Sequence, residues 1–331
     1  MKLRWKYFLV LVAASLVPLL AVTLISQNAS RRLGTTISES AKNNLAETIS
    51  QEMVRATRSY ADLINLGGFA SEQVLRRLAA RAELALILPP PPDTEIYYAA
   101  DFDDPGSAPR DMAPSENHPV RSNSGVVSYK QISRRHPNFL LAPGTRKADV
   151  ALDIARFTRL SPTLKSISQQ YQEGLFWVYA SLENGVHISY PGHGGYPAGY
   201  DPRQRPWYKM AMKSNTVSWL PVVDATTGQL TVTVSMPFQR PDVSPAGVAA
   251  MDLKVKYALA ESETTARWSE KMSSFVFGLE KNSGSEKEKI WVLSSQNKSA
   301  LAGSYPAEEM FSQHPEIEAL FHLIKNEKSG Y

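Results

Sequence analysis

A run of twenty residues without a charged side chain, Tyr7 to Ser26, constrains this chain more than any other feature. A helix of that length rises about 30 Å, the thickness of the hydrocarbon layer of a bilayer. Lys2, Arg4 and Lys6 precede the run, and positive flanking residues stay in the cytoplasm. We therefore expect a cytoplasmic N-terminus at 1–6, one transmembrane helix at 7–26, and an extracytoplasmic remainder.

A cleaved signal peptide is the alternative interpretation of the same run. The run exceeds the roughly 7 to 15 apolar residues usual in signal peptides, and no good small-x-small cleavage site follows it. Arg31 and Arg32 on the far side slightly weaken the orientation argument. The pattern favours an uncleaved anchor.

Length and composition indicate a globular chain rather than a disulfide scaffold or a nucleic-acid binder. The 331 residues are enough for two domains of ordinary size. The chain has no cysteine, which excludes disulfides, thiolate zinc sites and a cysteine nucleophile. Its 36 Lys and Arg are scattered among 32 Asp and Glu, for a net charge of +4, so no basic stripe suggests nucleic acid.

The segment 27–88 has the pattern of a helical stalk. From Thr36 onward, apolar residues recur every three or four positions, namely at Ile37, Ala41, Leu45, Ile49, Met53, Ala56, Tyr60 and Leu63. Such a stripe predicts a packing face, either for the following domain or for the same helix of a second subunit in a homodimer. We expect Gly67 and Gly68 to interrupt the helix and Pro89 to Pro92 to end it.

The next segment, Thr94 to Pro143, is polar and poor in periodicity, which predicts a long surface excursion with one or two short strands. Asp101, Asp103 and Asp104 lack the glycine and closing glutamate of an EF-hand loop, so a solvated acidic loop is favoured over calcium. Helical character returns from Ala148 to Gln172.

A series of strands follows and predicts an antiparallel sheet. We expect strands at Leu175–Ser181, Val186–Tyr190, Val217–Val223, Gln229–Phe238 and Gly247–Leu253. The fourth of these alternates apolar residues with Thr and Ser, which predicts one buried face and one polar face. Helices before an antiparallel sheet make an α+β fold.

Between the second and third strands lies the stretch Tyr200 to Tyr208, which combines charge, aromatic rings and prolines. Pro206 suits the first position of a short helix, and it would hold Arg205 and Trp207 in fixed relative directions. A guanidinium presents a planar fork of donors to a carboxylate, and the rings form flat walls. The stretch is typical of a recognition site for a small charged molecule; a surface corner with a buried tryptophan is the alternative.

Asp252 is the second candidate residue, at the end of the last strand. Strand alternation places it on the same face as Val248 and Ala250, where a carboxylate needs a partner. The partner is an internal arginine in a salt bridge, or a ligand. In the second case Asp252 binds an ammonium and Arg205 binds a carboxylate, so the pocket fits a zwitterion.

Other chemistry has weak support. His187 and His193 lack a third metal ligand, and the Gly192–Gly195 loop has no following Lys and Ser or Thr for a nucleotide. No hydrolase or metalloprotease motif is present, so we predict no enzyme activity, no cofactor and no metal for this chain.

The stretch Tyr-Asp-Pro-Arg-x-Arg-Pro-Trp-Tyr, the Asp-x-x-Thr-Gly turn at Asp224–Gly228 and the strand Ala246–Leu253 closely resemble the double Cache sensor domains, PAS-like modules of bacterial receptors. The resemblance implies a single-pass inner-membrane protein whose residues 27–331 are periplasmic. It also implies a membrane-distal, ligand-binding Cache module at 89–254.

Members that bind amino acids carry an Arg-x-Trp-Tyr element, a further Tyr and a late Asp. Residues Arg205, Trp207, Tyr208 and Asp252 match this pattern, with Tyr200 at the start of the motif. The further Tyr is absent, because Pro221 is followed by Val222. The resemblance therefore implies a small zwitterionic or amine ligand held by Tyr200, Arg205, Trp207, Tyr208, Asp224 and Asp252, although capping a turn is the alternative role of Asp224.

The segment 255–331 resembles a linker helix and the start of a second, membrane-proximal Cache module. We expect a helix at Val255–Met272, strands at Ser274–Leu279 and Ile290–Ser294, and a helix at about Ala307–Lys325. The resemblance implies an output domain beyond this chain: a PPM-type serine phosphatase behind a HAMP linker or a histidine kinase, ahead of a chemotaxis transducer or a cyclase. A non-binding periplasmic scaffold and an inactive truncated receptor are the rival interpretations.

Overall fold

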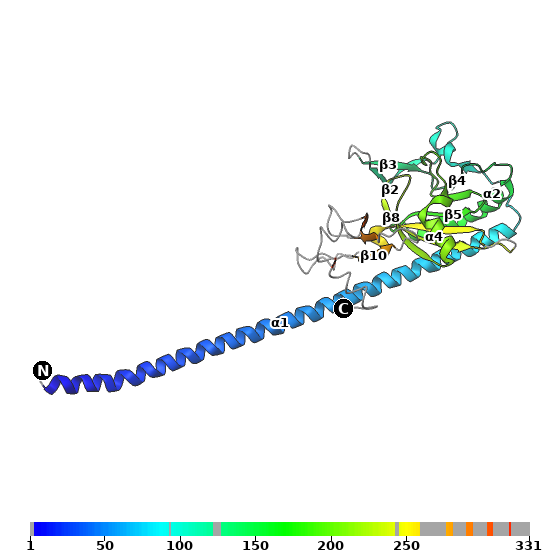
Figure 1. Cartoon of the computed structure of the whole chain (residues 1–331). Coiled ribbons are helices and arrows are strands. Elements are labelled where there is room, and N and C mark those ends of the chain that lie inside the picture. The colour runs from blue at the N-terminus through cyan, green and yellow to red at the C-terminus, as the bar shows by residue number, and fades with distance from the viewer. Residues whose placement is uncertain are drawn as a thin grey trace. The chain divides into compact units, whose positions relative to one another are not determined.

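The computed structural model describes residues 3–92, 94–121, 127–241 and 245–258, the segments 276–280, 289–293 and 303–306, and residue 318. The chain divides after Tyr60 into two compact units. The first unit is helical, and the second carries the sheet (Figure 1).

The long N-terminal helix α1 runs without a break from Leu3 to Ile87 (Figure 1). Within the described residues it is the one helix long and apolar enough to cross a membrane, judged by length and composition alone. The predicted interruption at Gly67 and Gly68 is wrong. Glycine costs a helix about 1 kcal/mol relative to alanine, which a long helix tolerates. The helix ends where Pro89 begins the proline run, as predicted.

The second unit is built on a seven-stranded sheet of order β1-β4-β6-β5-β9-β8-β7. Its strands are β1 (Tyr97–Tyr98), β4 (Asn138–Leu141), β5 (Leu175–Leu182), β6 (Val186–Tyr190), β7 (Ser218–Val223), β8 (Leu230–Phe238) and β9 (Gly247–Lys254). All neighbours are antiparallel except β1 and β4. The five strands predicted from Leu175 onward are confirmed, and so is the α+β class.

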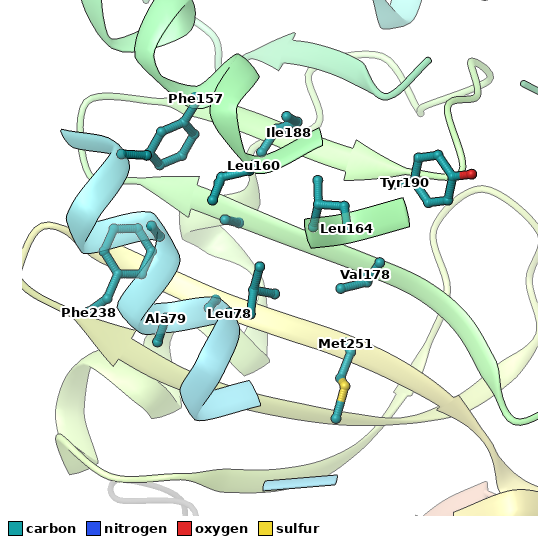
Figure 2. Packing of buried hydrophobic residues seen from close by; sticks show 14 of the residues in the cluster. Leu78, Ala79, Phe157, Leu160, Leu164, Val178, Ile188, Tyr190, Phe238 and Met251 are labelled. Atoms are coloured by element: carbon teal, nitrogen blue, oxygen red, sulfur yellow. The ribbon is translucent and has the colours of Figure 1, made fainter. Parts of the chain in front are cut away.

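One face of the sheet packs against helices. The last turns of α1, α2 (Ala151–Phe157) and α3 (Ser161–Gln170) enclose a core that includes Leu78, Phe157 and Leu164. Figure 2 shows Leu78 and Ala79 of α1 facing strands that carry Val178 and Met251. Burying such side chains contributes about 1.5–3 kcal/mol each, so this core fixes the end of α1 on the sheet.

The opposite face carries α4 (Pro206–Ser214) and the hairpin of β2 (Ala113–Arg121) and β3 (Val127–Ile132). Trp207 of α4 and Ile132 of β3 belong to its apolar cluster. The segment 94–143 is thus more ordered than predicted, since two of its strands join the main sheet and two form this hairpin.

The polar face of β8 is also buried, because it lies under this second layer. Thr231, Thr233 and Ser235 are each at most 2% exposed, where the sequence pattern alone predicts a polar side for the strand. Ser235 donates a hydrogen bond to the backbone oxygen of Trp207 at 3.1 Å. The hydroxyl-bearing side of the sheet therefore faces other protein groups.

After β9, the short helix α5 (Val255–Ala258) begins where a linker helix is predicted. A separate antiparallel sheet comprises β10 (Val276–Glu280), β11 (Lys289–Leu293) and β12 (Gly303–Pro306). The two predicted strands are confirmed by β10 and β11, and β12 is additional. The rest of the linker helix and most of the helix predicted at 307–325 lie outside the described residues, and the domain boundaries stay predictions.

Candidate functional site

A small cavity of about 30 Å³ lies on the sheet face that carries α4. It is lined by Trp177, Tyr179, His187, Ser189, His193, Tyr196, Tyr200, Arg205, Trp207, Val222, Val223, Asp224, Ala225, Thr226 and Asp252. The structure brings together five of the six predicted site residues, and Tyr208 is the exception. A cavity of this volume has room for ordered water.

Asp252 lies in β9 at the centre of this face. Its neighbours in register are Trp177 of β5 and Thr233 of β8. Its Oδ1 accepts hydrogen bonds from the hydroxyl of Thr233 at 2.5 Å and from Tyr179 at 2.9 Å. Burial raises the pKa of Asp252 to about 7, although both hydrogen bonds act to lower it. Near neutral pH the carboxyl is therefore poised between its two protonation states.

Arg205 occupies the N-cap position of α4, directly before Pro206, which begins the helix as predicted. Its Nη2 donates to the backbone oxygen of Val223 at 3.2 Å, and its guanidinium lies 5.7 Å from the ring centre of Tyr200. Five N–H groups are available to a guanidinium, so one backbone bond leaves most of its donors for another acceptor.

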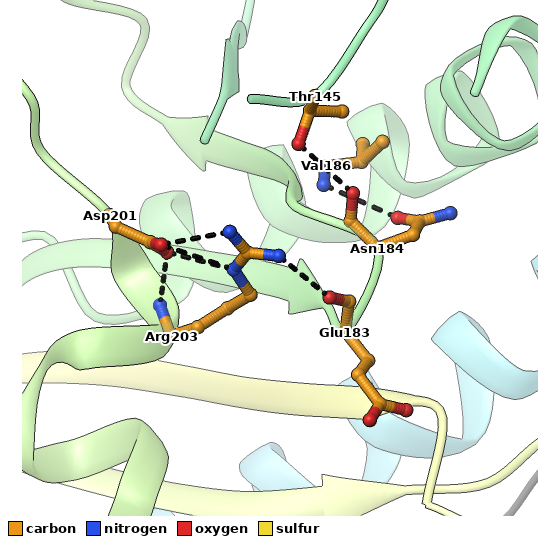
Figure 3. Close-up of polar contacts among 6 residues, drawn as sticks. All are labelled: Thr145, Glu183, Asn184, Val186, Asp201 and Arg203. Carbon is orange, nitrogen blue, oxygen red and sulfur yellow. Dashed lines mark hydrogen bonds and ion pairs between the residues drawn. The ribbon is translucent and has the colours of Figure 1, made fainter. Parts of the chain in front are cut away.

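A separate ion pair holds the segment that leads to Arg205. Arg203 and Asp201 form an ion pair of 2.8 Å, and Arg203 also donates to the backbone oxygen of Glu183 at 3.2 Å (Figure 3). Glu183 belongs to the turn between β5 and β6, where Asn184 accepts from the N–H of Val186. The Arg205 segment is thereby tied to the same hairpin that forms part of the cavity.

No ion pair joins Arg205 to Asp252 in the part of the chain that the structure describes. Asp252 is bonded to two hydroxyl groups and Arg205 to a backbone carbonyl. The internal salt bridge that the sequence left open is therefore not the arrangement observed.

The remaining predicted residues divide into walls and supports. Trp207 is 2% exposed and packs edge-on against Tyr179, with ring centres 5.0 Å apart. Tyr208 is buried beside it but does not line the cavity, because it follows Trp207 on the helix and points elsewhere by about 100°. Asp224 caps its own turn, since its Oδ2 accepts from the backbone N–H and the hydroxyl of both Thr226 and Thr227. The capping alternative for Asp224 is the arrangement observed.

Sequence reasoning missed the cavity residues of β5 and β6. Trp177 and Tyr179 alternate along β5, and His187 and Ser189 along β6, so all four share the face of Asp252. Strand alternation alone could have placed them on one side of each strand. Only the order of the strands in the sheet shows that these residues lie beside Asp252, and the sequence pattern does not give that order.

The two cavity histidines are uncharged at neutral pH. Burial lowers the pKa of His187 to about 3 and that of His193 well below its usual value. His187 Nδ1 lies 2.7 Å from the hydroxyl of Ser181, and His193 Nδ1 lies 3.0 Å from the oxygen of Gly194. Among the described residues, no group of three or more His, Cys, Asp or Glu side chains is arranged to hold a metal ion.

The glycine-rich loop before the motif packs against the acidic segment. The backbone N–H of Gly195, whose φ is +71°, donates to Asp103 at 2.9 Å. Asp101 and Asp104 likewise accept hydrogen bonds from their own loop, from the N–H of Tyr98 and of Gly106. These carboxylates support the loops around the site.

Comparison with known proteins assigns a relationship to this part of the chain. Residues 156–258 match the family described as methyl-accepting chemotaxis protein-like, first PDC sensor domain. This segment contains all six predicted site residues.

Two curated relatives agree with that match. The methyl-accepting chemotaxis protein McpB of Bacillus subtilis (strain 168) is 33% identical over 103 residues, which cover 30% of this chain and 15% of McpB. PscA, a methyl-accepting chemotaxis protein of Pseudomonas syringae pv. tomato, is 35% identical over 86 residues, or 26% of this chain and 13% of PscA. The chain thus spans only a small part of the curated relatives it matches.

Among solved structures, the ligand-binding domain of the Pseudomonas fluorescens chemoreceptor CtaA in complex with L-serine is 22% identical. That likeness has a TM-score of 0.34 and covers 48% of this chain and 61% of that domain. On the family match and the curated relatives, the segment that carries the cavity is similar to the first PDC sensor domain of methyl-accepting chemotaxis proteins.

Proposed function

We propose that this chain is the sensory part of a membrane-anchored receptor and that its cavity binds a small zwitterionic or amine ligand outside the cytoplasm. One observation carries the proposal: a guanidinium and a buried carboxylate line the same cavity, and no ion pair joins them among the described residues. A molecule with both charges supplies the missing partner of each.

The polarity of the site sets the orientation of such a ligand. The carboxylate of an amino acid pairs with Arg205, and its ammonium pairs with Asp252. A bound ammonium favours the charged form of Asp252, whose pKa of about 7 in the described state makes that deprotonation inexpensive. The rings of Tyr200 and Trp207 form apolar walls beside the charges.

Binding of a ligand changes the balance between the states of the sensor domain, because the ligand selects the state that it binds more tightly. Trp177 and Asp252 have strand neighbours, Val178 and Met251, in the core that includes Leu78 of α1 (Figure 2). A shift of β5 and β9 therefore acts on the packing of α1, which is our proposed route for the signal.

The wider assembly extends this proposal. The apolar stripe of α1 is exposed, with Ile37 and Leu45 each at 60%, which supports a homodimer through the stalk as a way to cover it. We place the anchor at residues 7–26 in the inner membrane and residues 27–331 in the periplasm. The relatives favour a chemotaxis-type output over the serine phosphatase or histidine kinase that the sequence alone ranked first.

The rival function is a scaffold that binds nothing, in which Arg205 and Asp252 stabilise each other. That rival predicts that Arg205→Ala destabilises the fold, because it leaves a buried carboxylate uncompensated. The observed partners of Asp252, Tyr179 and Thr233, favour the sensor instead, since Arg205 is absent from them.

The test is a thermal-shift screen of the full chain in detergent micelles against single amino acids, amines, carboxylates and nucleobases. A ligand at a hundred times its dissociation constant adds about 2.7 kcal/mol of stability. We expect an amino acid to stabilise the wild type and Lys209→Ala, an exposed control on α4, but not Arg205→Ala. If only amines stabilise the chain, the site is assigned to Asp252. If none of the compounds stabilises the chain, the proposal is contradicted.

A further inference from the structure

A second and larger cavity, of about 300 Å³, lies among the helices that cover the other face of the sheet. Its lining comes from the end of α1, the 3₁₀ helix η2 (Thr158–Leu160) and the first turn of α3, and consists of Arg81, Leu84, Ala85, Leu88, Arg159, Pro162 and Thr163. It shares no residue with the cavity that Asp252 lines. Pockets that hold small organic molecules have volumes of about 300–1,000 Å³, so this α1–α3 groove is large enough for one.

Contacts within the protein hold the walls of the α1–α3 groove in place. Nε of Arg159 donates to the backbone oxygen of Pro89 at 2.7 Å, which ties η2 to the end of α1. Arg77 of α1 donates to the side-chain oxygen of Gln170, at the end of α3, at 3.4 Å. Leu164 of α3 points away from the groove into the core (Figure 2). The groove therefore exists without a ligand.

The lining of the groove combines an apolar strip with two positive charges. Ala85 is 2% exposed and Leu84 is 42% exposed, so the apolar strip of α1 reaches from the core to the surface. Arg81 is exposed and forms no ion pair within the described part of the chain. Arg159 uses one N–H for Pro89, and a guanidinium has four more. The lining contains no Asp or Glu, so nothing in it neutralises these two cations.

We infer that the α1–α3 groove is a second ligand site, which binds a small organic carboxylate with an apolar body. The carboxylate pairs with Arg81 and Arg159, whose planar donors match its two oxygens, and the body covers Leu84 and Leu88. An inorganic anion leaves this apolar strip uncovered, and an apolar cation meets two like charges. The inference does not depend on the proposed function, because the two cavities have no residue in common.

Three probes test the inference by ligand-observed NMR titration of the full chain in micelles of an uncharged detergent: benzoate, benzamide and acetate. Benzamide has the shape of benzoate without its charge, and acetate has the charge without the ring. We expect benzoate to bind about fivefold more tightly than either, since the ion pairs and the apolar contact each add affinity.

Variants of the groove locate the binding of benzoate. Arg81→Gln should weaken benzoate about threefold and leave benzamide unchanged. Leu84→Glu and Leu84→Gln have nearly the same shape, and only the former brings a negative charge into the groove, so it should bind benzoate at least fivefold more weakly than Leu84→Gln. Arg76→Gln is the control from the same helix, because Arg76 pairs with Glu72 and does not line the groove.

Arg205→Ala separates the two cavities. Benzoate binding that survives Arg205→Ala and is lost in Leu84→Glu supports the groove, whereas binding that Arg205→Ala abolishes belongs to the first cavity and overturns the inference. The inference also fails if benzoate does not bind, if benzamide binds as tightly, or if Arg81→Gln and Leu84→Glu bind benzoate like the wild type. The ligand-free melting temperature checks the fold of each variant, and both substituted positions are exposed.

Discussion

The phenolic hydroxyl of Tyr179 donates a hydrogen bond of 2.9 Å to Oδ1 of Asp252. Thr233 donates to the same oxygen from the neighbouring strand. Among the described residues, Oδ2 accepts no side-chain hydrogen bond, so it is the oxygen left for a ligand. Tyr179 thus orients a buried carboxylate within the cavity that Arg205 also lines.

Replacing Tyr179 with phenylalanine tests this orientation. The ring packing against Trp207 is kept, but the carboxylate loses a hydrogen bond that lowers its pKa. We expect ligand affinity at pH 7 to fall by about tenfold, since hydrogen bonds to charged groups contribute roughly 1.5–3 kcal/mol. Calorimetric titration of the ligand found in the screen measures the loss, and unchanged affinity at pH 7 would show that Tyr179 does not act through Asp252.

The raised pKa of Asp252 predicts a pH dependence of stability. Its value is about 7 in the folded chain against 3.8 in a model peptide, so between these values the native state binds more protons than the unfolded state. The contribution of Asp252 to the free energy of unfolding is fully present below about pH 4 and is lost as the pH rises to about 7. Asp252→Asn, without ligand, should therefore gain stability relative to the wild type from about pH 4 to about pH 7. Urea unfolding across that range measures the difference, and a constant difference would contradict the assignment.

Arg203 is predicted to support binding without touching the ligand, because it holds the Arg205 segment to the turn at Glu183 (Figure 3). Arg203→Ala should weaken ligand binding several-fold. It should cost less than about 1 kcal/mol of stability, since its ion pair with Asp201 is partly exposed. Lys209→Ala is the control from the adjacent helix. Equal binding by wild type and Arg203→Ala would mean that Arg205 is positioned by α4 alone.

The continuity of α1 predicts that its paired glycines are dispensable for the fold. An added methyl group meets nothing within 4 Å at Gly67, and only the ring of Trp219 at 3.7 Å at Gly68. Gly67→Ala and Gly68→Ala should each stabilise the chain by up to about 1 kcal/mol. Thermal unfolding followed by circular dichroism measures the change. A lower melting temperature in either variant would indicate that the helix needs its glycines to bend.

The sequence correctly predicted features that depend on residues close together in the chain. Pro206 begins α4 because its ring suits the first helical position, and the β5–β6 hairpin turns at Glu183–Gly185 as its sequence indicates. Asp252 lies on the face of Val248 and Ala250 because side chains alternate along β9. Each of these features depends on neighbours within a few residues.

Features that depend on distant segments could not be predicted from the sequence. The weak pattern of 94–143 hides β1 and β4, whose strand pairing is completed by β6. The sequence pattern predicts that the hydroxyl-bearing face of β8 is exposed to solvent, but in the structure α4 covers this face. Trp177 and His187 join the site only because β5 lies between β6 and β9.

The most direct test of the central claim is to match ligand charge to residue charge. L-alanine, propionate and ethylamine are titrated calorimetrically into the wild type, Arg205→Ala and Asp252→Asn, each as the full chain in detergent micelles. If the two residues hold opposite ends of one ligand, the wild type binds alanine more tightly than it binds propionate or ethylamine. Arg205→Ala should then bind alanine no more tightly than ethylamine, and Asp252→Asn should bind alanine no more tightly than propionate. An alanine preference that survives both substitutions would contradict the account.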